Sequence, residues 1–151
     1  MPQSLAQIYV HLIFSTRGRV PFLRDQRLRG ELHAYLAETL HRLDSPSLRT
    51  GGVEDHIHSL FRLGRIQSVA EIVREVKRVS SKWLKEKTPN LRDFHWQSGY
   101  AAFSISPTHL EKLQEYIVSQ EEHHKSESFQ DEVRRICGFY GVGLDERYAW
   151  D

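Results

Sequence analysis

Two histidines that flank a single apolar residue are the first side chains in this sequence with evident chemistry. His56, Ile57 and His58 form the triplet, and Glu54 and Asp55 stand directly before it. Neutral imidazoles suit a transition-type divalent ion, and nearby oxygen ligands extend the choice to Mn²⁺ or Mg²⁺. A chain with 9 histidines also produces such a triplet by chance. Taken alone, the pair fits a metal site and, equally, two solvated histidines at the edge of a core.

A second candidate lies in the stretch "EYIVSQEEHH". Tyr116 and Gln120 are four residues apart, so on a helix they share one side, next to an apolar stripe of Leu110, Leu113 and Ile117. A tyrosine beside such a stripe is commonly a packing residue, and a glutamine one turn later is commonly solvated. By itself, this pair is a weak indication of catalysis.

Several nearby residues offer alternative ligands. His123 and His124 follow Gln120 by three and four positions and are able to replace it as metal ligands. Glu54 and Asp55 would assist a metal ion or simply meet solvent at the flank of a hairpin. The sequence leaves these roles open, together with that of the C-terminal "DERYAWD", which would pack on a partner subunit or on the active site.

The histidine pair requires a rigid strand to hold it. Residues 8–15 alternate between two faces and are rich in β-branched and aromatic side chains, which predicts a strand. Gly51 and Gly52 separate two further extended runs, "SLRT" and "VEDHIHSLFRL", and predict an antiparallel hairpin with its turn at the glycines. Residues two apart on a strand point to the same side, so Ile57 would anchor the strand in the core while both imidazoles point outward.

Helices are expected between the strands. Apolar residues recur at spacings of three and four from about residue 24 to residue 43, and again after Ser68, a plausible N-cap. A strand is expected around residues 100–105. Ser106 and Pro107 then begin a third helix, since serine caps and proline is favoured at the first helical position.

The order of these elements is strand, helix, strand, strand, helix, strand, and then helices. It predicts an α+β fold with a ferredoxin-like (split βαβ, RRM-like) antiparallel sheet, helices on one face, and a C-terminal helical appendage that carries Tyr116. The length of 151 residues suits one domain, so we expect residues 1–151 to form a single unit, with about 107–151 as the tyrosine helix and acidic extension.

Charge is distributed unevenly along the chain. Residues 1–106 contain 16 Lys and Arg against 10 Asp and Glu, whereas residues 107–151 contain 5 against 10. The basic part suggests a polyanionic partner such as nucleic acid. We found no signal peptide and no apolar run long enough to cross a membrane, and Cys137 is the only cysteine, so the sequence predicts a soluble protein of the cytoplasm.

Five segments together give the sequence a resemblance to a known family. They are, in order, "YVHLIFSTRGR", "VEDHIHSLFRL", "WQSGYAAFSIS", "YIVSQEEHH" and "YGVGLDERYAWD". These segments cover nearly the whole chain and resemble the single-tyrosine HUH transposases of bacterial insertion sequences, the small TnpA-like enzymes, and their relatives the REP-associated tyrosine transposases.

The resemblance implies a function and a set of site residues. His56 and His58 match the metal-binding histidines of the family, Tyr116 matches its nucleophile, and Gln120 matches its third protein ligand. Family members cleave single-stranded DNA beside hairpins, form a 5′-phosphotyrosine bond and rejoin ends at a 3′-hydroxyl with a divalent metal, Mg²⁺ or Mn²⁺. Because a phenol has a pKa of about 10, it must be activated or must attack a strongly polarised phosphate. Transesterification conserves bond energy, which agrees with the absence of an ATP-binding motif.

The resemblance also implies partners. Single-stranded DNA with hairpin ends would be the substrate, and a homodimer is expected in which the tyrosine helix of one subunit can complete the histidine site of the other. Phosphate contacts would come from exposed basic residues near the first strand and on the second helix. They are Arg17, Arg19, Arg74, Lys77, Arg78, Lys82 and Lys85.

Two other functions compete with a DNA strand-transferase. One is a catalytically silent or domesticated protein of the same fold that only binds nucleic-acid hairpins, for which aromatic residues on an open sheet would be the sign. The other is a metal-dependent phosphodiesterase that uses water in place of Tyr116. The presence of all four expected site residues favours the transferase.

Overall fold

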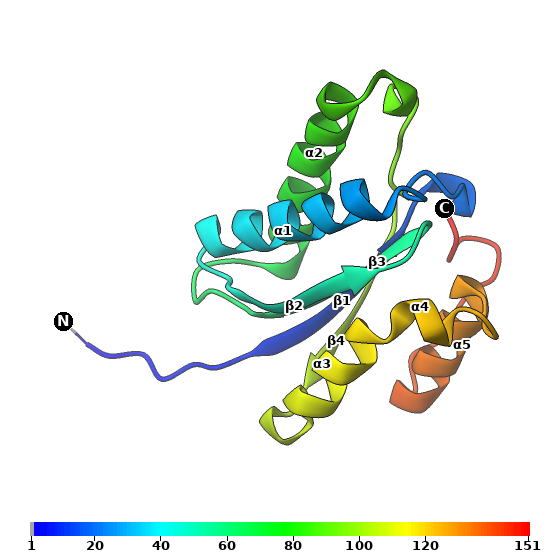
Figure 1. The fold of residues 1–151 in the computed structure, drawn as a ribbon. Helices are drawn as coiled ribbons and strands as arrows, with labels where there is room; N and C mark the ends of the chain where they lie inside the picture. Colours follow the sequence, from blue (N-terminus) through cyan, green and yellow to red (C-terminus); the bar gives the residue numbers. More distant parts are fainter. Residues whose placement is uncertain (1) are drawn as a thin grey trace.

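A four-stranded antiparallel sheet forms the centre of the computed structural model, which describes residues 2–151. Its strands are β1 (Tyr9–Ser15), β2 (Ser47–Gly52), β3 (His56–Arg62) and β4 (Ala101–Ile105). They lie in the order β2-β3-β1-β4, so β1 and β3 are the two central strands (Figure 1). This is the ferredoxin-like order, and the predicted α+β fold is confirmed.

Two long helices cover one face of the sheet. They are α1 (Gln26–Arg42) and α2 (Val69–Lys87), and both begin at a capping side chain (Figure 1). Asp25 accepts hydrogen bonds from the backbone N–H groups of Arg27 and Leu28 in α1, and Ser68 accepts one from the backbone N–H of Glu71 in α2. These caps satisfy donors that a helix leaves free at its start.

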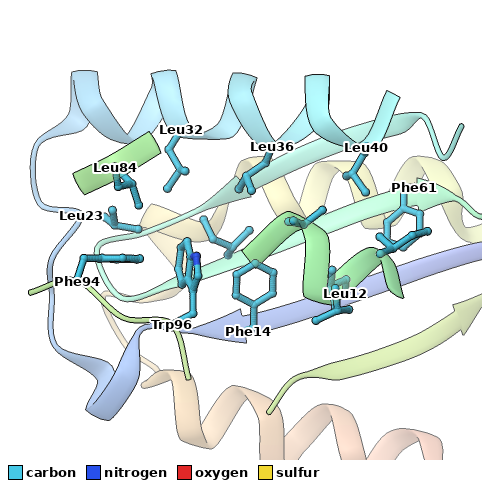
Figure 2. Packing of buried hydrophobic residues seen from close by; sticks show 14 of the residues in the cluster. Leu12, Phe14, Leu23, Leu32, Leu36, Leu40, Phe61, Leu84, Phe94 and Trp96 are labelled. Carbon is cyan, nitrogen blue, oxygen red and sulfur yellow. The ribbon is translucent and has the colours of Figure 1, made fainter. Parts of the chain in front are cut away.

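The main core lies between this helical pair and the sheet. Alternate residues of β1 and β3 point into it, because successive side chains of a strand face opposite sides. Figure 2 shows Leu12, Phe14 and Phe61 of the sheet packed under Leu32, Leu36 and Leu40 of α1, with Leu23, Leu84, Phe94 and Trp96 closing one end.

The opposite face of the sheet carries the C-terminal helices. They are α3 (Leu110–Val118), α4 (Gln120–His123) and α5 (Phe129–Tyr140) (Figure 1). Ser106 caps a short 3-10 turn, Pro107–His109, that leads into α3. A second, smaller cluster joins Ile13 and Phe103 of the sheet to α5. The single cysteine, Cys137, is buried in that cluster.

The hairpin exists, but its turn lies elsewhere than predicted. Gly51 and Gly52 are part of β2 and pair with His58 and Ile57, so the turn falls at residues 53–55. The glycines are needed within the strand for space: a Cβ atom at Gly52 would lie 2.2 Å from the carbonyl oxygen of His56. The two glycines therefore mark close packing of the backbone and not a two-residue turn.

The C-terminal tail packs on its own chain. Arg19 donates a hydrogen bond to the carbonyl oxygen of Trp150 (2.7 Å), and the backbone N–H of Gly99 donates to that of Asp151 (2.9 Å). Among the helices of residues 2–151, none combines the length and the apolarity that crossing a membrane requires.

Candidate active site

The histidine pair is held by the central strand β3. Ile57 is fully buried in the main core, and His56 and His58 point to the opposite face of the sheet. Both imidazoles point away from the main core, as predicted, but both are covered and 0% exposed. The reason is tertiary, because α3, α4 and α5 cover this face.

The predicted partners of the pair reach it from the same chain. Gln120 begins α4 and is buried, and its Oε1 lies 3.0 Å from Nε2 of His56. The ring of Tyr116, on α3, lies edge-on to that of His58 with 5.8 Å between centroids. The predicted single helix is interrupted at Ser119, yet Gln120 Nε2 still contacts the carbonyl oxygen of Tyr116.

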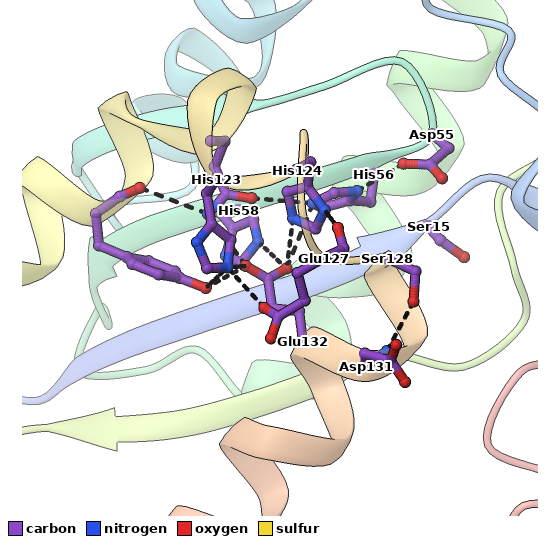
Figure 3. Close-up of polar contacts among 12 residues, drawn as sticks. Ser15, Asp55, His56, His58, His123, His124, Glu127, Ser128, Asp131 and Glu132 are labelled. Atoms are coloured by element: carbon purple, nitrogen blue, oxygen red, sulfur yellow. Dashed lines mark hydrogen bonds and ion pairs between the residues drawn. The ribbon is translucent and has the colours of Figure 1, made fainter.

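A buried glutamate of α5 completes the group. Glu132 is 0% exposed, and its Oε1 lies 2.9 Å from Nε2 of His58, 3.1 Å from Nε2 of His124 and 3.5 Å from Nε2 of His56. Figure 3 shows these side chains converging in the space between the sheet and α5. Sequence reasoning missed Glu132. The available signal was its place on the otherwise apolar side of α5, beside Phe129.

Each of the three imidazoles is also fixed through its other ring nitrogen. Nδ1 of His56 lies 2.7 Å from a carboxylate oxygen of Asp55. Nδ1 of His58 lies 2.8 Å from Nε2 of His11. Nδ1 of His124 lies 2.6 Å from the backbone carbonyl oxygen of Glu127. All three Nε2 atoms are therefore directed toward Glu132.

The charges in this group depend on one another. Burial opposes the negative charge of Glu132, but hydrogen bonds with His124, His56 and His58 outweigh it and hold the pKa of its carboxyl far below the usual range. Burial also opposes charging of His56, yet Asp55 and Glu132 raise its pKa to about 9. Burial dominates at His58 and lowers its pKa to about 4. The buried carboxylate of Glu132 thus faces His56, which is easily protonated, and His58, which is not.

The hydroxyl of Tyr116 lies at the more open end of the group. It donates a hydrogen bond to Oε2 of Glu132, and Nη2 of Arg135 lies 2.9 Å from it. Nε2 of His123 is 3.4 Å away. Burial, followed by the neighbouring carboxylate, raises the pKa of Tyr116, so the phenol is neutral in this setting.

The alternative ligands named from the sequence are now placed. His124 faces the buried group, whereas His123 faces Tyr116 and Glu127 at its rim. Asp55 contacts His56, and Glu54 is exposed.

The predicted DNA-binding residues occupy different environments. Four of them are exposed: Arg17 near β1, and Arg74, Arg78 and Lys82 on α2. Lys85 is half-buried on α2, Arg78 is paired with Glu75, and Arg19 is engaged by the C-terminal tail.

Lys77 differs from the other basic residues. Its Nζ donates to the carbonyl oxygens of Gln97 (2.8 Å) and Gly99 (2.6 Å) and lies over the ring of Phe14. Burial lowers the pKa of this side chain to about 8. Its ammonium group therefore ties α2 to the chain before β4.

The buried group has the composition of a metal site. One nitrogen of each of His56, His58 and His124 and one oxygen of Glu132 all lie within 4.8 Å of one another. Imidazole and carboxylate are common ligands of divalent transition ions. The donors present therefore fit a divalent metal ion, and the Oε1 atom of Gln120 lies beside them.

Two of three comparisons with known proteins found matches. A family model described as "Transposase IS200 like" matches residues 4–120, which include His56, His58, Tyr116 and Gln120. The match ends before His124 and Glu132. A search of curated proteins found no match.

Two solved structures share the fold. One is a protein of Deinococcus radiodurans R1 assigned as a transposase, with 18% identity and a TM-score of 0.61 over 80% of this chain and 95% of that one. The other is a REP-associated tyrosine transposase bound to a REP hairpin, with 13% identity and a TM-score of 0.59 over 82% of this chain and 73% of that one. At these identities the similarity establishes the fold.

Proposed function

This chain belongs to the IS200-like transposases, and on that premise we propose that it cleaves and rejoins single-stranded DNA with Tyr116 as nucleophile. The observation that carries the proposal is the position of Glu132, whose two oxygens contact the Tyr116 hydroxyl and the nitrogens of His56 and His58. A nucleophile and a group that fits a metal ion are thereby joined in one site.

The reaction is an exchange of phosphate esters. A bond forms between the Tyr116 oxygen and the scissile phosphorus, and the bond to the 3′-oxygen breaks. Overall, the phenol proton is transferred to the departing 3′-oxygen, which leaves as a hydroxyl. The 5′-phosphotyrosine retains the ester bond, so a 3′-hydroxyl can reverse the step and join strands without an added high-energy compound.

Two side chains prepare Tyr116 for this attack. Glu132 accepts the hydroxyl hydrogen and thereby directs an oxygen lone pair away from itself. The guanidinium of Arg135 lies 2.9 Å from the same oxygen and is half exposed, so it can also meet a phosphate. A cation at this place stabilises negative charge that develops during transfer.

His56, His58 and Gln120 would hold a divalent ion, Mg²⁺ or Mn²⁺, in the same site. Such an ion supplies positive charge that polarises the phosphate and stabilises the leaving 3′-oxygen. Gln120 is suited to this role because its Oε1 lies 3.0 Å from Nε2 of His56 and its side chain is buried.

The substrate would be single-stranded DNA with hairpin ends. A REP hairpin is bound to one of the solved structures that share this fold. Arg17, Arg19 and the basic residues of α2 would contact phosphates, which gives affinity that falls with salt but little choice of sequence. Those of α2 are Arg74, Arg78, Lys82 and Lys85, whereas the ammonium group of Lys77 is engaged by the carbonyl oxygens of Gln97 and Gly99. The reaction would take place in the cytoplasm, and residues 1–151 would act as one domain.

We propose a homodimer in which each subunit carries its own site. Support comes from Tyr116 and Gln120, which reach the histidines of their own chain. A shared arrangement, in which these helices exchange between subunits, would require α3 to leave its contact with Gly51.

A covalent adduct tests the proposal. A hairpin-bearing oligonucleotide labelled on the 5′ side or on the 3′ side of the nick is incubated with protein and Mn²⁺ and then denatured. The proposed enzyme retains only the label 3′ to the nick, because that fragment carries the 5′-phosphate. Cleavage without an adduct would indicate a phosphodiesterase that uses water, and binding without cleavage a silent hairpin-binding protein.

A further inference from the structure

We propose that His124 and Glu132 are metal ligands in this chain, so that three imidazoles and one carboxylate hold the ion together with His56 and His58. This inference deepens the proposed function, since it concerns the same site. It adds ligands from the segment that follows the family match, which ends at residue 120.

The distances fit a coordination shell. Ligand atoms about 2.1 Å from an ion lie roughly 3.0 Å from one another at octahedral angles and roughly 3.4 Å at tetrahedral angles, and an octahedral shell leaves positions for Gln120 and a phosphate. Oε1 of Glu132 lies 2.9, 3.1 and 3.5 Å from Nε2 of His58, His124 and His56. Small movements of the side chains would therefore admit an ion between these four atoms.

The second nitrogens of the histidines support the same conclusion. In metal sites, the imidazole nitrogen that does not bind the ion is usually held by a carboxylate, a backbone carbonyl or water. Asp55 holds His56 and the carbonyl oxygen of Glu127 holds His124 in this way, while Nε2 of His11 takes the same position at His58. All three rings thus present Nε2 to one point.

His123 provides an internal contrast. It is adjacent to His124 in the chain, but its Nε2 lies 2.6 Å from Glu127 and 3.2 Å from Arg135, at the partly exposed rim. Nε2 of His123 lies 3.7 Å from Oε2 of Glu132, the oxygen that faces Tyr116, whereas Nε2 of His124 lies 3.1 Å from Oε1, the oxygen that faces His56 and His58. The two positions are therefore a matched pair for substitution.

The donors also select among ions. A set with three neutral nitrogens and one carboxylate favours Mn²⁺, Co²⁺ or Zn²⁺ over Mg²⁺, which prefers oxygen ligands and retains water. The anionic Glu132 compensates part of the charge of a divalent ion in a space that excludes solvent. Gln120 Oε1, close to His56, would be an additional oxygen donor.

Titration with Co²⁺ in the absence of DNA tests this donor set. We expect one bound ion per chain, and we expect Glu132→Gln and His124→Ala each to weaken binding by about 100-fold or more, as loss of a ligand should exceed the 10–100-fold typical of outer contacts. His123→Ala should leave the affinity unchanged. Equal affinity of Glu132→Gln, His124→Ala and the unaltered protein would overturn the proposal.

A measurement on the unaltered protein avoids dependence on variant folding. X-ray absorption of the Zn²⁺-loaded protein counts the imidazole ligands, and three of them support the proposal, whereas two overturn it. Both tests are independent of catalysis. A protein that binds metal as proposed but forms no DNA adduct would contradict the proposed function alone, and one that forms the adduct with only two imidazoles bound would contradict this inference alone.

Discussion

Gly51 of β2 lies so close to Ile117 of α3 that a Cβ atom at this position would come within 2.9 Å of both Cγ2 and the carbonyl oxygen of Ile117. Ile117 is buried and adjacent to Tyr116. Gly51 pairs with His58 in the ladder between β2 and β3. Because Gly51 has no side chain, α3 can pack closely against these two strands.

Substitution of this glycine should move the nucleophile. We expect Gly51→Ala to displace α3, to lower the rate of adduct formation, and to reduce the free energy of unfolding by about 1–3 kcal/mol, as overpacking does. Gly30→Ala is the control, because nothing lies within 4 Å of a Cβ atom there and alanine favours the helix by roughly 0.5–1 kcal/mol. An unaltered rate of adduct formation in Gly51→Ala would show that the close packing of α3 against β2 does not matter for catalysis.

Tyr116→Phe removes only the proposed nucleophilic oxygen. We expect the covalent adduct to disappear and hairpin binding to persist, since the ring and its packing remain. Denaturing gels detect the adduct, and fluorescence anisotropy measures binding. Tyr148→Phe removes an equivalent hydroxyl from a residue that is 64% exposed and should form the adduct normally. Retained cleavage in Tyr116→Phe would refute the assignment.

Acid should destabilise the protein through His33 of α1. Burial, aided by the charge of Arg29, lowers the pKa of His33 to about 4 from 6.5, and its Nε2 is buried without a hydrogen-bond partner in residues 2–151. Between these values the unfolded chain binds the proton and the folded protein does not, so stability decreases as pH falls from 6.5 to about 4. The full shift corresponds to roughly 3 kcal/mol.

Denaturant unfolding at several pH values measures this effect. His33→Gln should reduce the dependence on pH in that window without removing it, because the pKa of His58 is lowered to about 4 as well. His41→Gln, at an exposed position of the same helix, is the control and should leave the dependence as it is. If the free energy of unfolding changed with pH by the same slope in both variants, His33 would not contribute to the pH dependence.

Two lysines of α2 should behave differently on substitution. Lys77→Met leaves the carbonyl oxygens of Gln97 and Gly99 without their donor and should reduce the free energy of unfolding by about 1–3 kcal/mol. Lys82→Met, at an exposed position, should change stability by less than about 0.5 kcal/mol.

Measurements of DNA binding test the second lysine, Lys82, whose substitution should leave stability almost unchanged. Lys82→Met should weaken hairpin binding and reduce the dependence of affinity on salt by about one unit of slope if it contacts a phosphate. Anisotropy titrations at several salt concentrations measure both quantities. Full stability in Lys77→Met would contradict the structural role of its ammonium group.

The sequence by itself determined the main strands and helices and singled out four residues of the site. Alternation along β1 and β3 and the apolar spacing of α1 and α2 predicted the ferredoxin-like sheet, because these patterns depend on local geometry. The same alternation placed His56 and His58 on one face. Spacing on a helix and the resemblance to a family singled out Tyr116 and Gln120.

Only the tertiary structure decided what surrounds these residues. The packing of α5 across the sheet buries His56 and His58 and brings Glu132 beside them. The same packing turns His124, and not His123, inward. Such contacts connect positions far apart in the chain, so no local pattern contains them. The position of Glu132 on the apolar side of α5 is explained only by its buried histidine partners, since a charge stays buried only beside groups that compensate it.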